Sequence, residues 1–105
     1  MNALEFVMSL KEKINPDAIA GHNTSFHFDI SGDGGGQKTV TITDGKLDVL
    51  DGLVGTPKCA VSVKADTLMK IVTGQENPMT AFMFGKIKVS NPGELMKYSK
   101  IFGLM

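Results

Sequence analysis

The feature of this sequence that most constrains its fold is a series of short segments in which apolar and polar residues alternate. From Ser25 onward, Phe26, Phe28 and Ile30 alternate with polar residues. The same alternation recurs in residues 39–43, 46–49, 59–64 and 86–89. A period of two places the apolar side chains on one face of a strand. The pattern therefore predicts a five-stranded, mainly antiparallel sheet with one face covered by helices and the other in water.

Segments with helical spacing lie before, between and after the predicted strands. Ala3, Val7, Leu10 and Ile14 recur at intervals of three or four residues and predict an amphipathic helix that ends before Pro16. Three more helices are predicted, over 67–72 with Asp66 as N-cap, over 78–84 with Asn77 as N-cap, and from Pro92 through Ile101 with Asn91 as N-cap. Helices and antiparallel strands in this order are typical of an α+β fold.

Length and charge restrict the organisation of the chain and its partners. We expect 105 residues to form a single domain, 1–105. Eleven basic side chains, all of them lysines, balance eleven acidic ones, which argues against nucleic acid as a partner. The single cysteine, Cys59, indicates a reducing compartment, and no apolar run reaches the eighteen or so residues that span a bilayer. We therefore expect a soluble, cytoplasmic protein.

The glycine-rich segment SGDGGGQ, residues 31–37, raises the question of a phosphate-binding loop. A dinucleotide-binding loop leads into the N-terminus of a helix, whereas this segment leads into the second predicted strand. The third glycine of that fingerprint would fall on Gln37, and no P-loop lysine motif follows. The segment therefore indicates a hairpin connection.

No arrangement of polar residues in the sequence indicates catalysis. His22 and His27 lack metal-ligand spacing with each other or with Cys59. Cys59 alternates with valines on the apolar face of its strand, where a free thiol behaves as a small hydrophobic group. The sequence predicts a protein that is not an enzyme and that uses no cofactor or metal.

An excess of apolar residues between Leu68 and Met105 is the main clue to function. Five of the seven methionines lie there, and bulky apolar side chains surround most of the helix predicted at 78–84. These residues alone leave two interpretations open. They fill an irregular core, or they face a second apolar partner such as a subunit, a membrane or a ligand, to which flexible methionines adapt readily.

A resemblance to a known family favours the ligand. Residues 65–89 read ADTLMKIVTGQENPMTAFMFGKIKV. A helix with an acidic start ends in glycine, and Asn-Pro, Ala-Phe and Gly-Lys with an alternating lysine strand follow in order, with Met96-Lys97 in the closing helix. This order resembles the sterol carrier protein type-2 domain family over nearly the whole chain. The resemblance implies an α+β fold that encloses an apolar tunnel between sheet and helices.

The resemblance also implies a function, which is non-catalytic binding and transport or presentation of apolar lipids such as fatty acids, acyl-CoA and sterols. The residues that would line, gate or close the tunnel are Leu68, Met69, Ile71, Val72, Met79, Phe82, Met83, Phe84, Met96, Ile101, Phe102 and Met105. The implied partners are the lipid itself, a lipid-metabolising enzyme and a transient membrane surface, with the chain a monomer or weak dimer.

Two alternatives accompany this interpretation. The Met/Phe surface is instead a protein interface, which would make the chain an accessory or dimerisation domain. Lys86, Lys88, Lys97 and Lys100 either contact lipid headgroups or a membrane surface, or they are solvated lysines, which is the commoner case.

Overall fold

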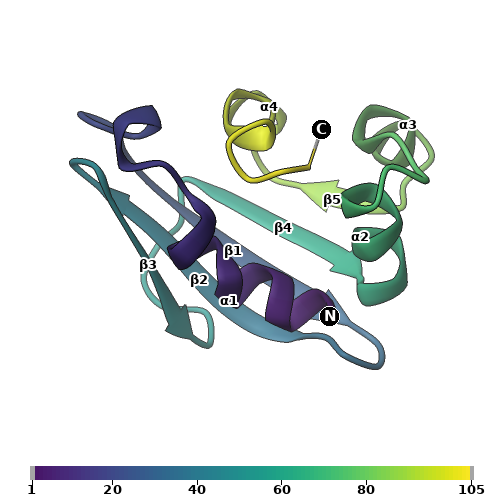
Figure 1. Cartoon of the computed structure of the whole chain (residues 1–105). Helices are drawn as coiled ribbons and strands as arrows, with labels where there is room; N and C mark the ends of the chain where they lie inside the picture. Colours follow the sequence, from purple (N-terminus) through teal and green to yellow (C-terminus); the bar gives the residue numbers. More distant parts are fainter. Residues whose placement is uncertain (1, 105) are drawn as a thin grey trace.

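The computed structural model describes residues 2–104 and confirms the predicted sheet (Figure 1). Its strands are β1 (Asn23–Ser31), β2 (Gly36–Thr43), β3 (Lys46–Asp51), β4 (Cys59–Lys64) and β5 (Ile87–Val89). They are ordered β3-β2-β1-β4-β5, and each neighbouring pair is antiparallel except β1 and β4. That pair is parallel because the chain leaves β3 at one edge and returns on the far side of β1.

Within residues 2–104, four α-helices and one short 3-10 helix cover a single face of this sheet (Figure 1). They are α1 (Ala3–Lys13), the 3-10 helix Pro16–Ala18, α2 (Ala65–Val72), α3 (Pro78–Met83) and α4 (Pro92–Ser99). Helix α1 packs over β2 and β3, α2 and α4 contact β4, and α3 contacts β5. The molecule is therefore the predicted α+β arrangement, with α2, α3 and α4 gathered over the β4–β5 end.

The start of α2 differs from the prediction. The N-cap position falls on Lys64, the last residue of β4, which makes no capping hydrogen bond through its side chain. Asp66 lies in the first turn instead, with its carboxylate 3.5 Å from the Lys70 ammonium. The predicted N-cap at Asp66 is wrong because β4 runs directly into the helix, which leaves no intervening residue to cap it.

The end of α4 also differs from the prediction. The helix stops at Ser99 rather than continuing through Ile101. Gly103, with φ of 77°, lets the chain reverse, so that its amide donates to the Lys100 carbonyl at 3.2 Å and the Leu104 amide donates to the Ser99 carbonyl at 2.8 Å. This closure turns Phe102 and Leu104 into the core, where both are buried.

The glycine-rich segment connects β1 and β2 as a hairpin, as predicted. A Cβ atom at Gly35 would lie 2.3 Å from the Ile30 carbonyl oxygen, so only glycine fits this turn without displacement. The Gly34 carbonyl accepts a hydrogen bond from the Leu4 amide at 3.0 Å. The turn therefore supports the beginning of α1.

The face of the sheet opposite the helices is not entirely open to water. Thr39 lies on that face, yet only 1% of it is exposed, because the segment after β3 folds over it. The Thr39 hydroxyl donates to the Gly52 carbonyl and accepts from the Val54 amide, both at 2.8 Å. The His27 ring, half-buried rather than fully solvated, bonds the Val54 carbonyl at 2.8 Å. The crossing from β3 to β4 thus accounts for a partly covered second face.

Candidate functional site

Two small apolar cavities lie among α2, α3, α4 and the sheet. The inner cavity has a volume of about 20 Å³ and is lined by Phe28, Val61, Val63, Leu68, Ile71, Pro78, Ile87, Leu95, Ser99 and Leu104. The outer cavity has a volume of about 60 Å³ and is lined by Pro78, Met79, Phe82, Val89, Pro92, Leu95 and Met96. Pro78 and Leu95 line both cavities, so these two side chains stand between them.

Helix α3 contributes Pro78 to both cavities and Met79 and Phe82 to the outer one, and few of its residues are buried. Its start is defined by Asn77, whose side-chain oxygen accepts from the Met79 amide at 2.8 Å and the Thr80 amide at 3.4 Å. Ala81 is its only buried residue within the described chain. Met79 and Phe82 are 43% and 38% exposed, so these two side chains bury only part of their apolar area, and α3 is packed less completely than a core helix.

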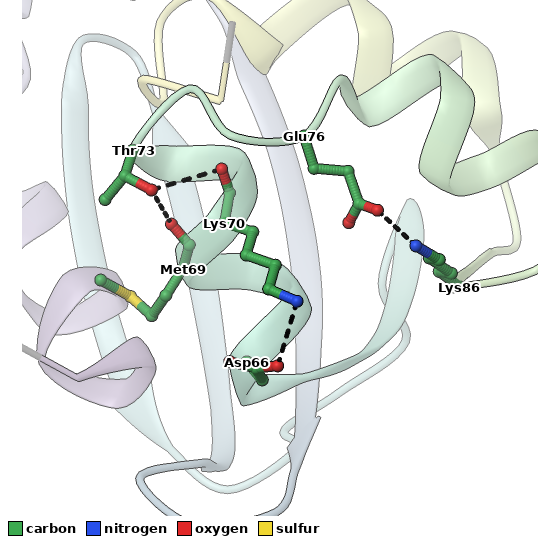
Figure 2. Close-up of polar contacts among 6 residues, drawn as sticks. All are labelled: Asp66, Met69, Lys70, Thr73, Glu76 and Lys86. Atoms are coloured by element: carbon green, nitrogen blue, oxygen red, sulfur yellow. Dashed lines mark hydrogen bonds and ion pairs between the residues drawn. The ribbon is translucent and has the colours of Figure 1, made fainter.

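An ion pair joins the segment before α3 to the segment after it. Figure 2 shows Glu76, before the helix, reaching Lys86 after it, with the carboxylate 2.5 Å from the ammonium. The second oxygen of Glu76 is buried and has no hydrogen-bond partner within residues 2–104. The Lys86 amide also donates to the Ala81 carbonyl at 2.8 Å. These contacts close the segment that contains α3 into a loop.

The connection between α2 and α3 is anchored to the end of α2. The Lys70 carbonyl accepts from the Gln75 amide at 2.8 Å and from the Glu76 amide at 3.1 Å. The Thr73 hydroxyl donates to the Met69 carbonyl at 2.8 Å, as drawn in Figure 2. Carbonyl groups at the end of α2 therefore order the connection, and they fix where α3 begins relative to α2.

The structure brings together some of the residues predicted to hold a ligand. Leu68 and Ile71 line the inner cavity, while Met79, Phe82 and Met96 line the outer one. These residues come from α2, α3 and α4, which meet only in the tertiary structure.

Other predicted ligand residues lie away from these cavities. Met69 lines a separate open hollow of about 550 Å³ between the ends of β1 and β4 and the starts of α1 and α2. Val72 and Ile101 are half-buried against the core. Met83 and Phe84 are 78% and 76% exposed and line neither cavity. Met105 lies outside the described residues.

Phe102 is a core residue rather than part of either cavity wall. Only 2% of it is exposed, and its ring packs edge to face on Phe26 with centroids 5.1 Å apart. It also stacks on Tyr98 at 6.0 Å. This aromatic cluster fills the space beside α4 on the inner face of β1.

Several lining residues were missed by the sequence interpretation. Val61, Val63 and Ile87 belong to the inward-facing sets of their strands, so the alternation itself was a usable signal. Pro78 and Leu95 gave no such signal, because their position between the two cavities depends on how α3 and α4 meet.

Two titratable side chains of the core, Cys59 and Tyr98, are buried and hydrogen-bonded. Cys59 is buried as predicted; its thiol donates to the Asn91 carbonyl at 3.5 Å, and burial raises its pKa, which disfavours the thiolate. The Tyr98 hydroxyl lies 2.8 Å from Nδ1 of His22, and burial raises the pKa of this phenol.

Residues 2–104 contain no group of three His, Cys, Asp or Glu side chains that could hold a metal ion. None of their helices is both long and apolar enough to cross a membrane.

Comparison with known proteins identifies the family of this fold. A sequence profile of the SCP-2 sterol transfer family matches residues 2–103. The chain is 29% identical over 103 residues to hydroxysteroid dehydrogenase-like protein 2 from Xenopus tropicalis, covering 96% of the chain and 25% of that protein. It is 31% identical over 80 residues to sterol carrier protein 2 from Bos taurus, covering 72% of the chain and 15% of that protein. The chain thus spans a quarter or less of the length of these relatives.

The fold agrees with this assignment. The solution structure of palmitated SCP2L2 from Aedes aegypti superposes with a TM-score of 0.75 at 20% identity, covering 97% of this chain and 95% of that one. The resemblance seen in residues 65–89 is therefore confirmed by a profile match over almost the full length. The chain belongs to the SCP-2 sterol transfer family.

Proposed function

We propose that this chain, acting as one domain over residues 1–105, binds an apolar lipid between α3, α4 and the sheet and transfers or presents it without catalysis. The observation that carries the proposal is the pair of apolar cavities separated by Pro78 and Leu95. Membership of the SCP-2 sterol transfer family and the fold shared with a palmitated protein support it.

Lipid binding requires the two cavities to join and enlarge. Ligand sites usually occupy about 300–1,000 Å³, whereas these cavities measure about 20 and 60 Å³. Helix α3 is the element that would move, because few contacts fix it in place. Ala81 is its only buried residue within residues 2–104, and its other anchors are its N-cap and the Glu76–Lys86 ion pair. Displacement of α3 would withdraw Pro78 from Leu95 and form one continuous tunnel.

The side chains around this tunnel suit ligands of variable shape. We assign the contacts with lipid to Leu68, Ile71, Met79, Phe82 and Met96, which line the cavities. The thioethers of Met79 and Met96 adapt to different chains or rings at little cost. The site therefore accepts a class of lipids, including fatty acids, acyl-CoA and sterols.

The energetics favour exchange over storage. Burying about twelve methylenes from water at about 0.8 kcal/mol each releases on the order of 10 kcal/mol before the costs of ordering and association are subtracted. A lipid leaving a bilayer moves from one apolar environment to another, so most of that gain disappears. A transfer or presentation role follows.

Native mass spectrometry of the purified protein, followed by thermal unfolding with added palmitate, palmitoyl-CoA or cholesterol, tests this proposal. We expect a mass excess that organic extraction removes, and stabilisation of about 2.7 kcal/mol at a ligand concentration one hundred times Kd. Met96→Trp, which fills the outer cavity, should weaken this stabilisation, while Met8→Trp on the exposed side of α1 should not. An unchanged mass and an unchanged Tm with all three lipids would contradict the proposal.

A role beside an enzyme is the second candidate. The chain corresponds to a quarter of a dehydrogenase-like protein, so lipid presentation to an enzymatic partner would use the same site. Faster turnover of a protein-bound lipid than of the same lipid in detergent would support this role.

A further inference from the structure

Two apolar side chains at the end of α3 are unusually exposed. Met83 and Phe84 are 78% and 76% exposed, more than any other large apolar residue of residues 2–104. Gly85 follows with φ of 74° and turns the chain from α3 into β5. Since β5 is an edge strand, this turn lies at the margin of the molecule (Figure 1).

A basic hollow begins at Gly85, the residue that follows Met83 and Phe84. It has a volume of about 280 Å³ and is lined by Ser31, Ser62, Val63, Lys64, Gly85, Lys86 and Lys88, with no acidic residue. Ser62 is paired with Lys88 between β4 and β5, and Ser31 with Lys64 between β1 and β4. Lys64 and Lys88 alternate with the buried Val63 and Ile87, so both project from the face of the sheet opposite the helices, at the end where β4 stops and β5 begins.

The charges of this hollow are largely available. Lys64 and Lys88 make no ion pair within residues 2–104, whereas Lys86 is held by Glu76. Lysine is a compact point charge that suits phosphate groups without requiring a fixed bidentate geometry. Since the chain has no net charge, attraction to an anionic surface must come from local groups of this kind.

We infer that the α3–β5 turn docks on an anionic lipid bilayer. Met83 and Phe84 enter the boundary between headgroups and acyl chains, and Lys64 and Lys88 contact lipid phosphates. A stable protein interface of ordinary size buries about 800 Å² on each partner, which is more than two side chains and a small hollow supply. A reversible bilayer contact needs only such a short apolar tip with a few adjacent cations.

Docking at this turn would bring the protein to the source of its lipid, so the inference rests on the proposed lipid transfer. The turn ends α3, the helix that contributes Pro78 to both cavities and Met79 and Phe82 to the outer one. Contact with a bilayer therefore acts on the element that must move for a lipid to enter. Docking itself needs no bound lipid, so it can be measured separately.

Vesicle co-sedimentation tests the docking surface. Wild-type protein is mixed with phosphatidylcholine vesicles, or with vesicles of phosphatidylcholine and phosphatidylglycerol in equal parts, at low and high salt. We expect binding to the anionic vesicles that falls with salt. Lys64→Gln with Lys88→Gln should lower the partition coefficient about 25-fold, near fivefold for each lysine. Met83→Ser with Phe84→Ser should lower it at least about tenfold.

Matched variants elsewhere on the surface serve as controls. Met8→Ser on α1 and Lys46→Gln on β3 remove an exposed apolar and an exposed basic side chain far from the turn in sequence. Each should bind vesicles as the wild type does. Circular dichroism verifies that all variants are folded.

Three results would overturn the inference. They are absence of wild-type binding to anionic vesicles, unchanged binding of both turn variants, and equal losses in the controls. A concentration-dependent dimer that the Met83→Ser, Phe84→Ser variant abolishes, without vesicle binding, would assign the surface to a second copy instead. Binding of a fluorescent fatty acid by the wild type without vesicles is measured in parallel. If the wild type bound anionic vesicles but did not bind the fluorescent fatty acid, the lipid site would be rejected and the docking surface would remain supported.

Discussion

At the scale of single residues, the two titratable groups of the core beside α4 show how burial controls protonation. The Cys59 thiol and the Tyr98 phenol both have a pKa raised by burial, and the negative charge of Glu94 acts in the same direction on each. Both side chains are therefore neutral at neutral pH, which is compatible with an apolar interior.

These two pKa shifts predict a loss of stability at alkaline pH. Above the ordinary values of 9.0 for cysteine and 10.0 for tyrosine, the unfolded chain releases protons that the folded chain retains. The free energy of unfolding should therefore be unaffected by these groups below about pH 9 and decline above it. Guanidinium unfolding at several pH values measures this decline. Cys59→Ala and Tyr98→Phe should each make it shallower, and a free energy that is constant up to pH 10 would contradict the prediction.

Two glycines of opposite character allow a matched pair of substitutions. Gly35→Ala should destabilise the protein by about 1–3 kcal/mol, because the new Cβ meets the Ile30 carbonyl oxygen at 2.3 Å. Gly93→Ala should stabilise it by about 0.5–1 kcal/mol, because Gly93 lies in α4 and its nearest atom to a new Cβ is 3.7 Å away. Thermal unfolding of both variants checks the two signs. If Gly35→Ala changed stability in the same way as Gly93→Ala, the hairpin turn would have to relax around the new Cβ atom without cost.

At the scale of elements, α3 has the fewest buried residues of the four α-helices described within residues 2–104. It has six residues, one of them buried, so its N-cap supplies a large share of its stability. The same weak packing is what allows it to act as the moving wall of the proposed tunnel.

Removal of this cap should loosen α3 selectively. Asn77→Ala leaves the Met79 and Thr80 amides without their acceptor and should cost about 1 kcal/mol. Hydrogen exchange should accelerate at the amides of α3 more than at those of α1. Asn77→Asp keeps an oxygen acceptor and serves as the control. Equal exchange rates in Asn77→Ala and wild type would show that the Glu76–Lys86 pair alone holds the helix.

Most elements were predictable from the sequence because each has a local signal. The alternation in β1 and the spacing of Ala3, Val7 and Leu10 in α1 both match the structure. The start of α2 and the end of α4 were not predictable. The start of α2 depends on β4 continuing directly into the helix, and the end of α4 depends on the packing of Phe102 in the aromatic cluster.

At the scale of the whole molecule, the core and the surface assign different roles to chemically identical side chains. Phe102 is packed against Phe26, Phe28 and Tyr98, whereas Phe84 is 76% exposed. Both belong to the same apolar excess in the C-terminal third of the sequence.

This contrast predicts unequal effects of the same substitution. Phe102→Ala should lower the free energy of unfolding by about 3–5 kcal/mol, because it leaves a cavity in the aromatic cluster. Phe84→Ala should change it by less than about 0.5 kcal/mol, because the ring is largely in water already. Guanidinium unfolding of the two variants gives the comparison. A small effect at Phe102 would mean that the core collapses around the gap or that a bound lipid fills it.

The sequence by itself determined the α+β class, the apolar face of each strand, the hairpin at residues 31–37 and the family. These properties are encoded in spacings of a few residues, which local sterics and the exclusion of apolar groups from water translate directly into structure. Only the tertiary structure decided which apolar residues meet. Met79 and Phe82 line a cavity while Met83 and Phe84 face water, although all four lie within six residues. Burial depends on which distant elements pack against each side of a helix, and helical spacing carries no information about those neighbours.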